Sequence, residues 1–308
     1  MRKAFIESLT ELASKDERIF LLTGDLGFSV FEDFHNKFPE RFFNVGVAEQ
    51  NLIGVAAGLA MSGKIVYAYS IAPFITMRCL EQVRNDICFH NQNVRLIGVG
   101  GGLSYGSAGP THHSIEDIAI MRALVNMTVI APGDPVEVKE AVKSSFKHIG
   151  PIYIRLGKGN EPTVHRSRRI NISKGIVIED GKDVTVFSSA GTLAIAKGVS
   201  NALTAHKVSV RLISMPTIKP LDNNLVIDST KRTKAIFTIE EHGLIGGLGS
   251  AVAELISETG NKIIFKRFAI PDNFNNKIIG SHKYLTNKCG LSAKQITSTI
   301  LKYLDGHK

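Results

Sequence analysis

Short apolar runs alternate with amphipathic helical patterns along most of the chain, and this alternation limits the possible folds more than any other feature. In the first half, strands are expected at Ile19–Leu22, Phe42–Val47, Ile65–Tyr69, Val94–Val99, Thr128–Ala131 and Ile152–Arg155, and helices over 3–14, 51–62, 74–89, 115–124 and 135–147. Strands that alternate with helices usually pair in parallel, because each helix provides the crossover connection. The pattern therefore predicts an α/β fold, a mainly parallel sheet flanked by helices.

A stretch rich in Gly, Asn, Arg and Lys, at about residues 157–182, divides the chain. After it, strands are expected near Val184–Ser188, Val208–Ser214, Ala235–Ile239 and Ile263–Phe268, with helices over 191–205, 248–259 and 292–303. With 308 residues, 44% of them apolar, the chain is long enough for two α/β domains. We expect domains at 1–160 and 183–308, joined by a linker at 161–182.

The net charge of +9 raises the question of a nucleic-acid partner. The basic residues are scattered, however, apart from one short cluster at Arg166–Arg169, and no nucleic-acid-binding motif accompanies it. Attraction of phosphorylated substrates or of an acidic partner chain explains the surplus, and we expect no nucleic-acid partner.

The chain carries no pattern typical of export or of a membrane span. Met1–Ile6 lead into an amphipathic pattern and not into an apolar signal segment, and no apolar run reaches the length of a membrane span. Cys79, Cys88 and Cys289 have neither zinc-site spacing nor the density of a disulfide framework. We therefore expect a cytoplasmic protein without membrane contact.

One carboxylate stands at a strand-to-helix turn, in Gly46–Asn51 (GVAEQN). The neighbours of Glu49, among them Val45, Val47 and Ala48, are small or apolar and would exclude water from it. A buried carboxylate is costly unless it is paired, so Glu49 is a candidate functional residue. The alternative is that Glu49 only occupies the first turn of the helix, where the helix dipole favours an acid.

Two further motifs follow in the first half. In Tyr69–Asp86, Phe74 begins a helical pattern, and Arg78 lies four residues later on the same helical face; Phe74 could also be an ordinary core aromatic. Gly106–Ser114 (GSAGPTHHS) is a glycine-rich loop in which His112 is either a proton-transfer residue or a loop-capping residue.

Gly150–Arg155 (GPIYIR) is a strand that ends in arginine. The planar fork of Arg155 suits phosphate oxygens, and Lys158 follows close by. The alternative is an arginine that only caps the strand end.

Together these motifs resemble, nearly end to end, the pyrimidine-binding and C-terminal domains of the transketolase family of thiamin-diphosphate enzymes. The family's Gly-Val-x-Glu-Gln motif places the catalytic acid, so the resemblance implies that Glu49 bonds the ring nitrogen of the cofactor's aminopyrimidine. Such a bond requires a dry site, because water would compete for both partners. The implied cofactor-binding residues are Glu49, Phe74, Ile75, Arg78 and Asp25.

The roles of these residues also follow from the resemblance. Phe74 is expected to stack on the pyrimidine, with Ile75 as the neighbouring wall. Asp25, in Gly24–Gly27, is a candidate to approach the thiazolium end of the cofactor.

The implied substrate contacts are His112 and Arg155. His112 would act on the substrate's hydroxyl and carbonyl oxygens and Arg155 would bind a phosphate, while His113 is expected to face solvent. The chain departs from the family in two places: Ala108 replaces an aspartate, and Gly98–Gly102 replaces a strand end that carries a histidine. Two polar substrate contacts are thus missing, which favours a different or less hydroxylated substrate.

The family's diphosphate-binding motif, Gly-Asp-Gly followed by asparagine, is not found. Gly24–Gly27 lacks the spaced asparagine, and Gly243–Ser250 lacks the spacing of a nucleotide fingerprint and is expected to be a turn into a helix. The resemblance therefore implies the C-terminal subunit of a split transketolase, which transfers a two-carbon ketol unit from a ketose or ketose phosphate to an aldose. An N-terminal subunit would hold Mg2+, Ca2+ or Mn2+ with the diphosphate. The expected assembly is a heterotetramer, and the chain is expected to be inactive alone.

Three alternatives stay open. The chain also resembles 1-deoxy-D-xylulose-5-phosphate synthase, which normally carries both halves on one chain, and the β subunit of 2-oxoacid dehydrogenases, whose loop chemistry differs. A non-catalytic partner subunit that has kept the fold is the third, although Glu49, Phe74 and His112 argue against it.

Overall fold

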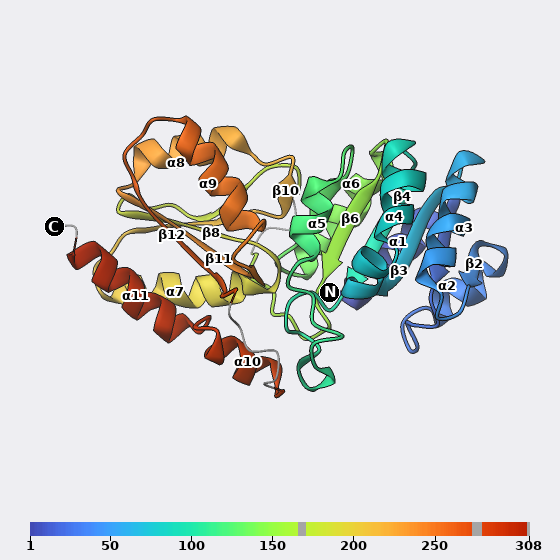
Figure 1. The fold of residues 1–308 in the computed structure, drawn as a ribbon, viewed down its shortest axis with the longest axis horizontal. Helices are drawn as coiled ribbons and strands as arrows, with labels where there is room; N and C mark the ends of the chain where they lie inside the picture. Colours follow the sequence, from blue (N-terminus) through green and yellow to red (C-terminus); the bar gives the residue numbers. More distant parts are fainter. Residues whose placement is uncertain (166–170, 273–278, 307–308) are drawn as a thin grey trace.

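Two α/β domains lie side by side in the computed structural model (Figure 1), which describes residues 1–165, 171–272 and 279–306. The helices of the first domain are α1 (Arg2–Ala13), α2 (Glu32–Lys37), α3 (Glu49–Met61), α4 (Leu80–Gln82), α5 (Asp117–Ala123) and α6 (Pro135–Lys147). Its strands are β1 (Ile19–Thr23), β2 (Phe42–Asn44), β3 (Ile65–Ile71), β4 (Val94–Val99), β5 (Thr128–Ile130) and β6 (Ile152–Leu156). The predicted α/β architecture is confirmed.

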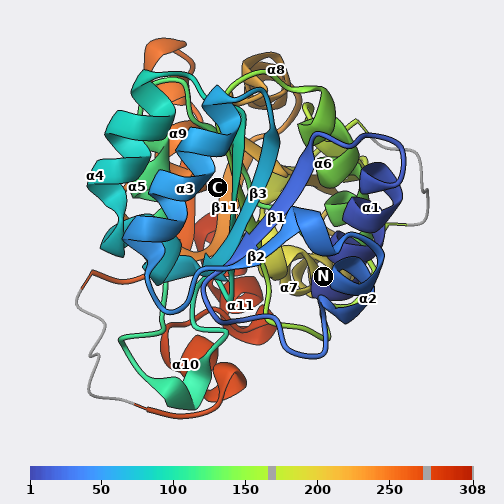
Figure 2. The same ribbon diagram turned by 90° about the vertical axis from the view of Figure 1, so that its right-hand side faces the viewer.

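The first sheet has the order β10-β5-β6-β4-β3-β1-β2, and all its neighbouring strands are parallel except β10 and β5. One face carries α1 and α6 and the other carries α3, α4 and α5 (Figure 2). Because both faces are covered, β3, β4 and β6 are buried along their whole length, as their continuous apolar runs require.

The second domain is built around a five-stranded sheet of order β12-β11-β8-β9-β7. Its strands are β7 (Ile176–Glu179), β8 (Val184–Ser188), β9 (Val210–Ser214), β11 (Ala235–Gly243) and β12 (Ile264–Ile270), and its helices are α7 (Leu193–Ala205), α8 (Asn223–Arg232), α9 (Leu248–Glu258), α10 (His282–Lys288) and α11 (Ala293–Asp305). Helices α7 and α11 lie on one face and α8 and α9 on the other (Figure 1).

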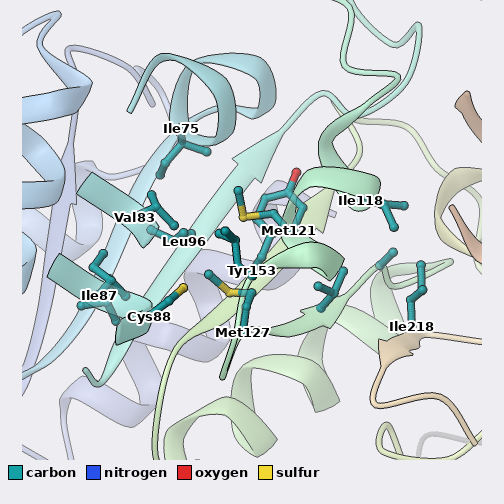
Figure 3. Close-up of a cluster of buried hydrophobic side chains, with 14 of the residues drawn as sticks. Ile75, Val83, Ile87, Cys88, Leu96, Ile118, Met121, Met127, Tyr153 and Ile218 are labelled. Atoms are coloured by element: carbon teal, nitrogen blue, oxygen red, sulfur yellow. The ribbon is translucent and has the colours of Figure 1, made fainter. Parts of the chain in front are cut away.

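A buried apolar cluster joins the two domains (Figure 3). It includes Ile75, Leu96 and Ile118 of the first domain. It also includes Ile218, which comes later in the sequence than the first strands of the second domain. Ile218 belongs to β10 (Thr217–Lys219), which pairs with β5 and so completes the first sheet with a strand from the second half of the chain.

Several elements differ from the predictions. Residues 74–89 are not a regular helix but two π-helical segments, Phe74–Arg78 and Val83–Phe89, on either side of α4. Strand β7 lies inside the predicted linker, β2 ends at Asn44, and β11 continues to Gly243. Strand β10 and helices α2, α8 and α10 were not predicted, while the Arg166–Arg169 cluster lies outside the described residues.

Within the described ranges, no helix is long and apolar enough to cross a membrane.

Candidate active site

Glu49 lies at the first position of α3, directly after a turn in which Gly46 adopts φ +76°. Glycine adopts this left-handed conformation without strain, so the chain can turn sharply from β2 into α3. The residue is only 1% exposed. Its Oε1 accepts a hydrogen bond of 2.8 Å from Ser70 Oγ on β3, and its Oε2 accepts one of 2.5 Å from a terminal nitrogen of Arg78. Glu49 is thus a buried carboxylate whose two oxygens are both bonded, as a charge in a dry site requires.

Phe74 and Arg78 form one face of the site. The Arg78 guanidinium carbon lies 4.0 Å from the centroid of the Phe74 ring, and the Arg78 side chain remains 42% exposed. The two residues do share a helical face, although the turn is π-helical.

Ile75 points the other way, into the apolar cluster of Figure 3, and has no exposed surface. Neighbouring positions on a helix face different directions, so Ile75 and Phe74 cannot line the same face. The predicted role of Ile75 as a wall of the cofactor site requires a position on the site face. The structure does not place Ile75 there.

His112 completes the aromatic side of the site. Its ring centroid lies 5.3 Å from that of Phe74 and 5.6 Å from that of Tyr105, and its Nδ1 is 3.0 Å from Thr111 Oγ1. The loop therefore brings His112 to the Phe74 and Arg78 face, with the residue partly accessible.

The sequence predicts that His113 faces solvent, but the structure buries it. It is 6% exposed, and its Nε2 lies 3.0 Å from the carbonyl oxygen of Gly106. A carbonyl only accepts, so Nε2 must carry a proton, and His113 holds the loop closed from inside.

Asp25 lies just after the end of β1 with φ +59° and is exposed. Its backbone N–H donates to Asn44 Oδ1 at 2.9 Å, and Asn44 Nδ2 donates to Asp25 Oδ1 at 3.0 Å. Asn44 Oδ1 also accepts from the N–H of Gly46 at 3.0 Å. Asn44, which was not predicted from the sequence, thus ties the Asp25 loop to the turn before Glu49.

Ser70, the buried donor to Glu49, was not predicted from the sequence either. A serine at the end of an apolar strand gives no indication of its partner. Only the parallel pairing of β1 and β3 beside α3 brings it to the carboxylate.

Arg155 is 3% exposed and already bonded to protein acceptors. Its Nε donates to Asp117 Oδ2 at 2.8 Å, and one terminal nitrogen donates to the carbonyl oxygens of Ser114 and Glu241, each at 2.9 Å. Because Glu241 belongs to β11, these bonds join the two domains. They favour a structural role over phosphate binding, and the phosphate contact stays a prediction.

A cavity of about 480 Å³ lies between the domains beside Arg155, lined also by Arg2, Lys158 and His282. The hydrogen bond of His282 to Glu241, at 2.8 Å from its Oε2, raises the pKa of this histidine. Lys158, which lines this cavity, places its Nζ 4.8 Å from the centroid of the Tyr105 ring, and the same ring lies beside His112.

The described residues include no group of three or more His, Cys, Asp or Glu that could hold a metal ion. Glu49, Phe74 and His112 fit a flat heteroaromatic ring that offers a nitrogen to a carboxyl group. Of these three side chains only Glu49 offers the oxygen ligands that a hard cation prefers, and both of its oxygens are bonded to Ser70 and Arg78, so the three residues account only for the ring side of such a site.

Comparison with known proteins gives consistent matches over both domains. The family described as transketolase, pyrimidine binding domain, matches residues 1–163, and the family described as transketolase, C-terminal domain, matches residues 173–296. A Methanocaldococcus jannaschii protein named as a transketolase C-terminal section is 37% identical over 98% of this chain and 95% of its own length. A subunit of the apulose-4-phosphate transketolase of Phocaeicola vulgatus is 34% identical over 98% of this chain and 97% of its own length.

The similarity extends to solved structures. A split-gene transketolase, solved as an inactive beta4 tetramer, has a TM-score of 0.90 and 38% identity, and the match covers 99% of this chain and 98% of that chain. Relatives named 1-deoxy-D-xylulose-5-phosphate synthase are 31–33% identical, but the match covers only 47–48% of their length.

Proposed function

The chain belongs to the transketolase family, and from this premise we propose that it is the C-terminal subunit of a two-chain transketolase. The reaction would transfer a two-carbon ketol unit from a ketose, or a ketose phosphate, to an aldose acceptor with thiamin diphosphate as cofactor. The observation that carries the proposal is the buried Glu49 carboxylate beside the accessible rings of Phe74 and His112.

When bound, thiamin diphosphate supplies the carbanion stabilisation needed to break a carbon–carbon bond next to a carbonyl. The chain's own residues would bind and orient it. Glu49 would hold a hydrogen bond to the ring nitrogen, with Ser70 keeping its other oxygen in place. Phe74 would pack against the ring, and His112 would hold or move a proton at the substrate's carbonyl and hydroxyl oxygens.

The missing side of the site supports a partner subunit. An N-terminal transketolase subunit would supply the diphosphate-binding residues and Mg2+, and the natural assembly would be a heterotetramer. The isolated chain would then be inactive, in line with the inactive tetramer of the split-gene relative. The cysteines Cys79, Cys88 and Cys289 are free and buried, which fits the reducing cytoplasm that we propose as the compartment.

Of the alternative functions, the synthase of 1-deoxy-D-xylulose 5-phosphate has a specific observation in its favour, because such enzymes match nearly the whole of this chain. The reaction would begin from pyruvate, a donor that lacks the hydroxyl groups of a ketose. The coverage favours the split transketolase, since the Phocaeicola vulgatus subunit matches this chain along almost all of its own length.

The test begins with purification of the protein from its native cells and identification of whatever co-purifies in stoichiometric amount. The complex is assayed with thiamin diphosphate, Mg2+ and ketose phosphates, and again with pyruvate as donor. We expect a companion chain with the diphosphate-binding motif and transfer to an aldose. Glu49→Gln, which keeps the volume of the side chain, should lower kcat by at least about 100-fold in this complex.

The other outcomes decide between the alternatives. Activity with pyruvate but not with ketose phosphates as the donor indicates the synthase type. A lipoyl-bearing acyltransferase in the complex indicates a 2-oxoacid dehydrogenase. Unchanged turnover in Glu49→Gln would mean that Glu49 is not the catalytic acid.

A further inference from the structure

Arg78 occupies the place at which the proposed cofactor ring would bind. Its guanidinium lies over the Phe74 ring at 4.0 Å and at the same time donates to Glu49 Oε2 at 2.5 Å. A guanidinium is flat and presents N–H donors at its edge. It thus meets the two requirements that Glu49 and Phe74 set for an aminopyrimidine: a planar group against the aromatic ring and a nitrogen at the carboxylate.

We propose that Arg78 is a placeholder that closes the cofactor site in the free subunit and must leave Glu49 and Phe74 before thiamin diphosphate can bind. This inference rests on the proposed function. The cofactor and the guanidinium cannot both stack on the same face of Phe74 and bond the same carboxylate oxygen. Binding therefore exchanges one partner of Glu49 for another.

The arrangement is suited to such an exchange. Glu49 is also held by Ser70, whose side chain is fully buried, and this bond need not change. Arg78, in contrast, is 42% exposed and approaches from the solvent side, where its long side chain can adopt another rotamer in water.

The free subunit gains from the placeholder. Without Arg78, a carboxylate that is 1% exposed would have Ser70 as its one remaining described hydrogen-bond donor. A buried charge that loses its ionic partner is strongly destabilised. Arg78 thus keeps the site folded until the cofactor arrives, in the free chain and in the complex with the partner subunit, and it lowers the apparent affinity for the cofactor by the fraction of molecules in which it blocks the site.

The test is the dissociation constant of thiamin diphosphate for the complex of this chain with its partner subunit, measured by calorimetry in the presence of Mg2+. Arg78→Met keeps much of the length of the side chain but cannot bond Glu49. We expect it to bind the cofactor roughly three- to tenfold more tightly than the unchanged complex, because the competing state is lost. Arg84→Met is the matched control, since Arg84 is an exposed arginine in the following π-helical segment that bonds Asn85 and not Glu49, and it should leave the dissociation constant unchanged.

A second readout concerns the free chain. Its thermal midpoint should fall in Arg78→Met and stay constant in Arg84→Met, because only the first change strips Glu49 of its ionic partner. If Arg78→Met does not fold, Arg78→Lys serves instead, since lysine keeps the charge but loses the planar stacking on Phe74. It should also tighten cofactor binding, by a smaller factor.

The outcomes separate this inference from the proposed function. Equal or weaker cofactor binding in the Arg78 variants overturns the placeholder and makes Arg78 a bystander or a direct ligand. If the unchanged complex does not bind thiamin diphosphate at all, the proposed function fails, and the placeholder fails with it.

Discussion

Phe74 and Ile75 are neighbours in sequence, but their side chains lie in different environments in the structure. Phe74 lies on the site face with Arg78 and His112, whereas Ile75 has no exposed surface and packs in the cluster that joins the domains. Exchanging each for alanine should therefore separate ligand binding from stability.

We expect Ile75→Ala to lower the free energy of unfolding by about 2–4 kcal/mol, because it leaves a cavity in the core, with little change in cofactor affinity. Phe74→Ala should weaken cofactor binding at least tenfold at a much smaller cost in stability. Denaturant titration of the free chain and calorimetry of the complex measure the two effects. The reverse pattern would show that the aromatic and aliphatic roles have been interchanged.

Single residues could be predicted from sequence where a motif fixes both the residue and its surroundings. The burial of Glu49 was predicted correctly, although Val47, one of the apolar neighbours expected to exclude water, is 72% exposed, and the spacing of Phe74 and Arg78 predicted their shared face. The orientation of His113 could not be predicted, because adjacent histidines on a glycine-rich loop differ only in backbone angles that the sequence does not specify.

Helices and strands with strong periodicity were predicted to within a few residues, as for α6, whose bounds of 135–147 agree. Strand β10 was missed because it has only three residues and its partner β5 is far away in the chain. A strand of this length is set by its tertiary partner and not by its own residues. The π-helical segments were missed for a similar reason, since a widened turn keeps much the same pattern of apolar residues.

The beginning of α6 carries a buried group of ionisable residues that the sequence did not indicate. Asp134 caps the helix and also lies 3.0 Å from His165 Nδ1, while Glu137 Oε1 lies 3.3 Å from His165 Nε2. Glu137 also accepts a bond of 2.5 Å from Ser214 on β9, so the group links α6, the residues after β6, and the second domain.

The environment moves these pKa values in different directions. Burial raises the pKa of Glu137 to about 7, although bonds from Ser214 and Gly133 oppose this. Burial alone would also raise the pKa of Asp134, but hydrogen bonds from His165 and from backbone N–H groups hold it well below its usual value. For His165, burial alone would lower the pKa, but the bond to Asp134 and the charge of Glu137 raise it.

Glu137 should therefore make the protein less stable as the pH rises. Between the ordinary pKa of a glutamate, about 4.3, and the value of about 7 in the folded chain, the native state holds a proton that the unfolded state has lost. Unfolding free energy falls with rising pH wherever the native state binds more protons. From pH 5 to pH 8, the unchanged protein should lose on the order of 2 kcal/mol relative to Glu137→Gln.

Denaturant titrations across this pH range provide the measurement. Glu140→Gln, on the same helix but bonded to Lys143 at the surface, is the matched control and should follow the unchanged protein. His165 titrates in all of these variants, and because the charge of Glu137 raises its pKa, the difference between the unchanged protein and Glu137→Gln reports the coupled Glu137 and His165 pair. A constant difference between the unchanged protein and Glu137→Gln would mean that Glu137 is ionised throughout.

Apolar packing, buried hydrogen bonds and backbone pairing all connect the two domains. The cluster of Figure 3 contains residues of both, β10 adds to the first sheet, and Arg155 bonds Asp117 and Glu241. The sequence predicted two domains but not these connections, because Asp117 and Glu241 are 38 and 86 residues away from Arg155. Contacts at such separations leave no periodic pattern.

Arg155 offers a test of how the two domains are held together. Its structural role and its phosphate-binding role predict different changes in the free energy of unfolding and in KM. If Arg155 connects the two domains, Arg155→Met leaves Asp117 buried with Tyr153 as its remaining described hydrogen-bond donor, at 2.6 Å. Breaking a buried pair by removing one partner costs about 3–5 kcal/mol, so we expect the free energy of unfolding to fall by that amount. The KM for phosphorylated and non-phosphorylated donors should then change by the same factor.

Lys158→Met is the matched control, because Lys158 is exposed and lines the same cavity without taking part in the Asp117 pair. We expect it to leave the stability unchanged. If Arg155 instead binds a substrate phosphate, Arg155→Met will raise the KM for phosphorylated donors selectively while the unfolding free energy changes little. Denaturant titration and donor kinetics on the same two variants therefore decide whether this arginine holds the two domains together or binds a substrate phosphate.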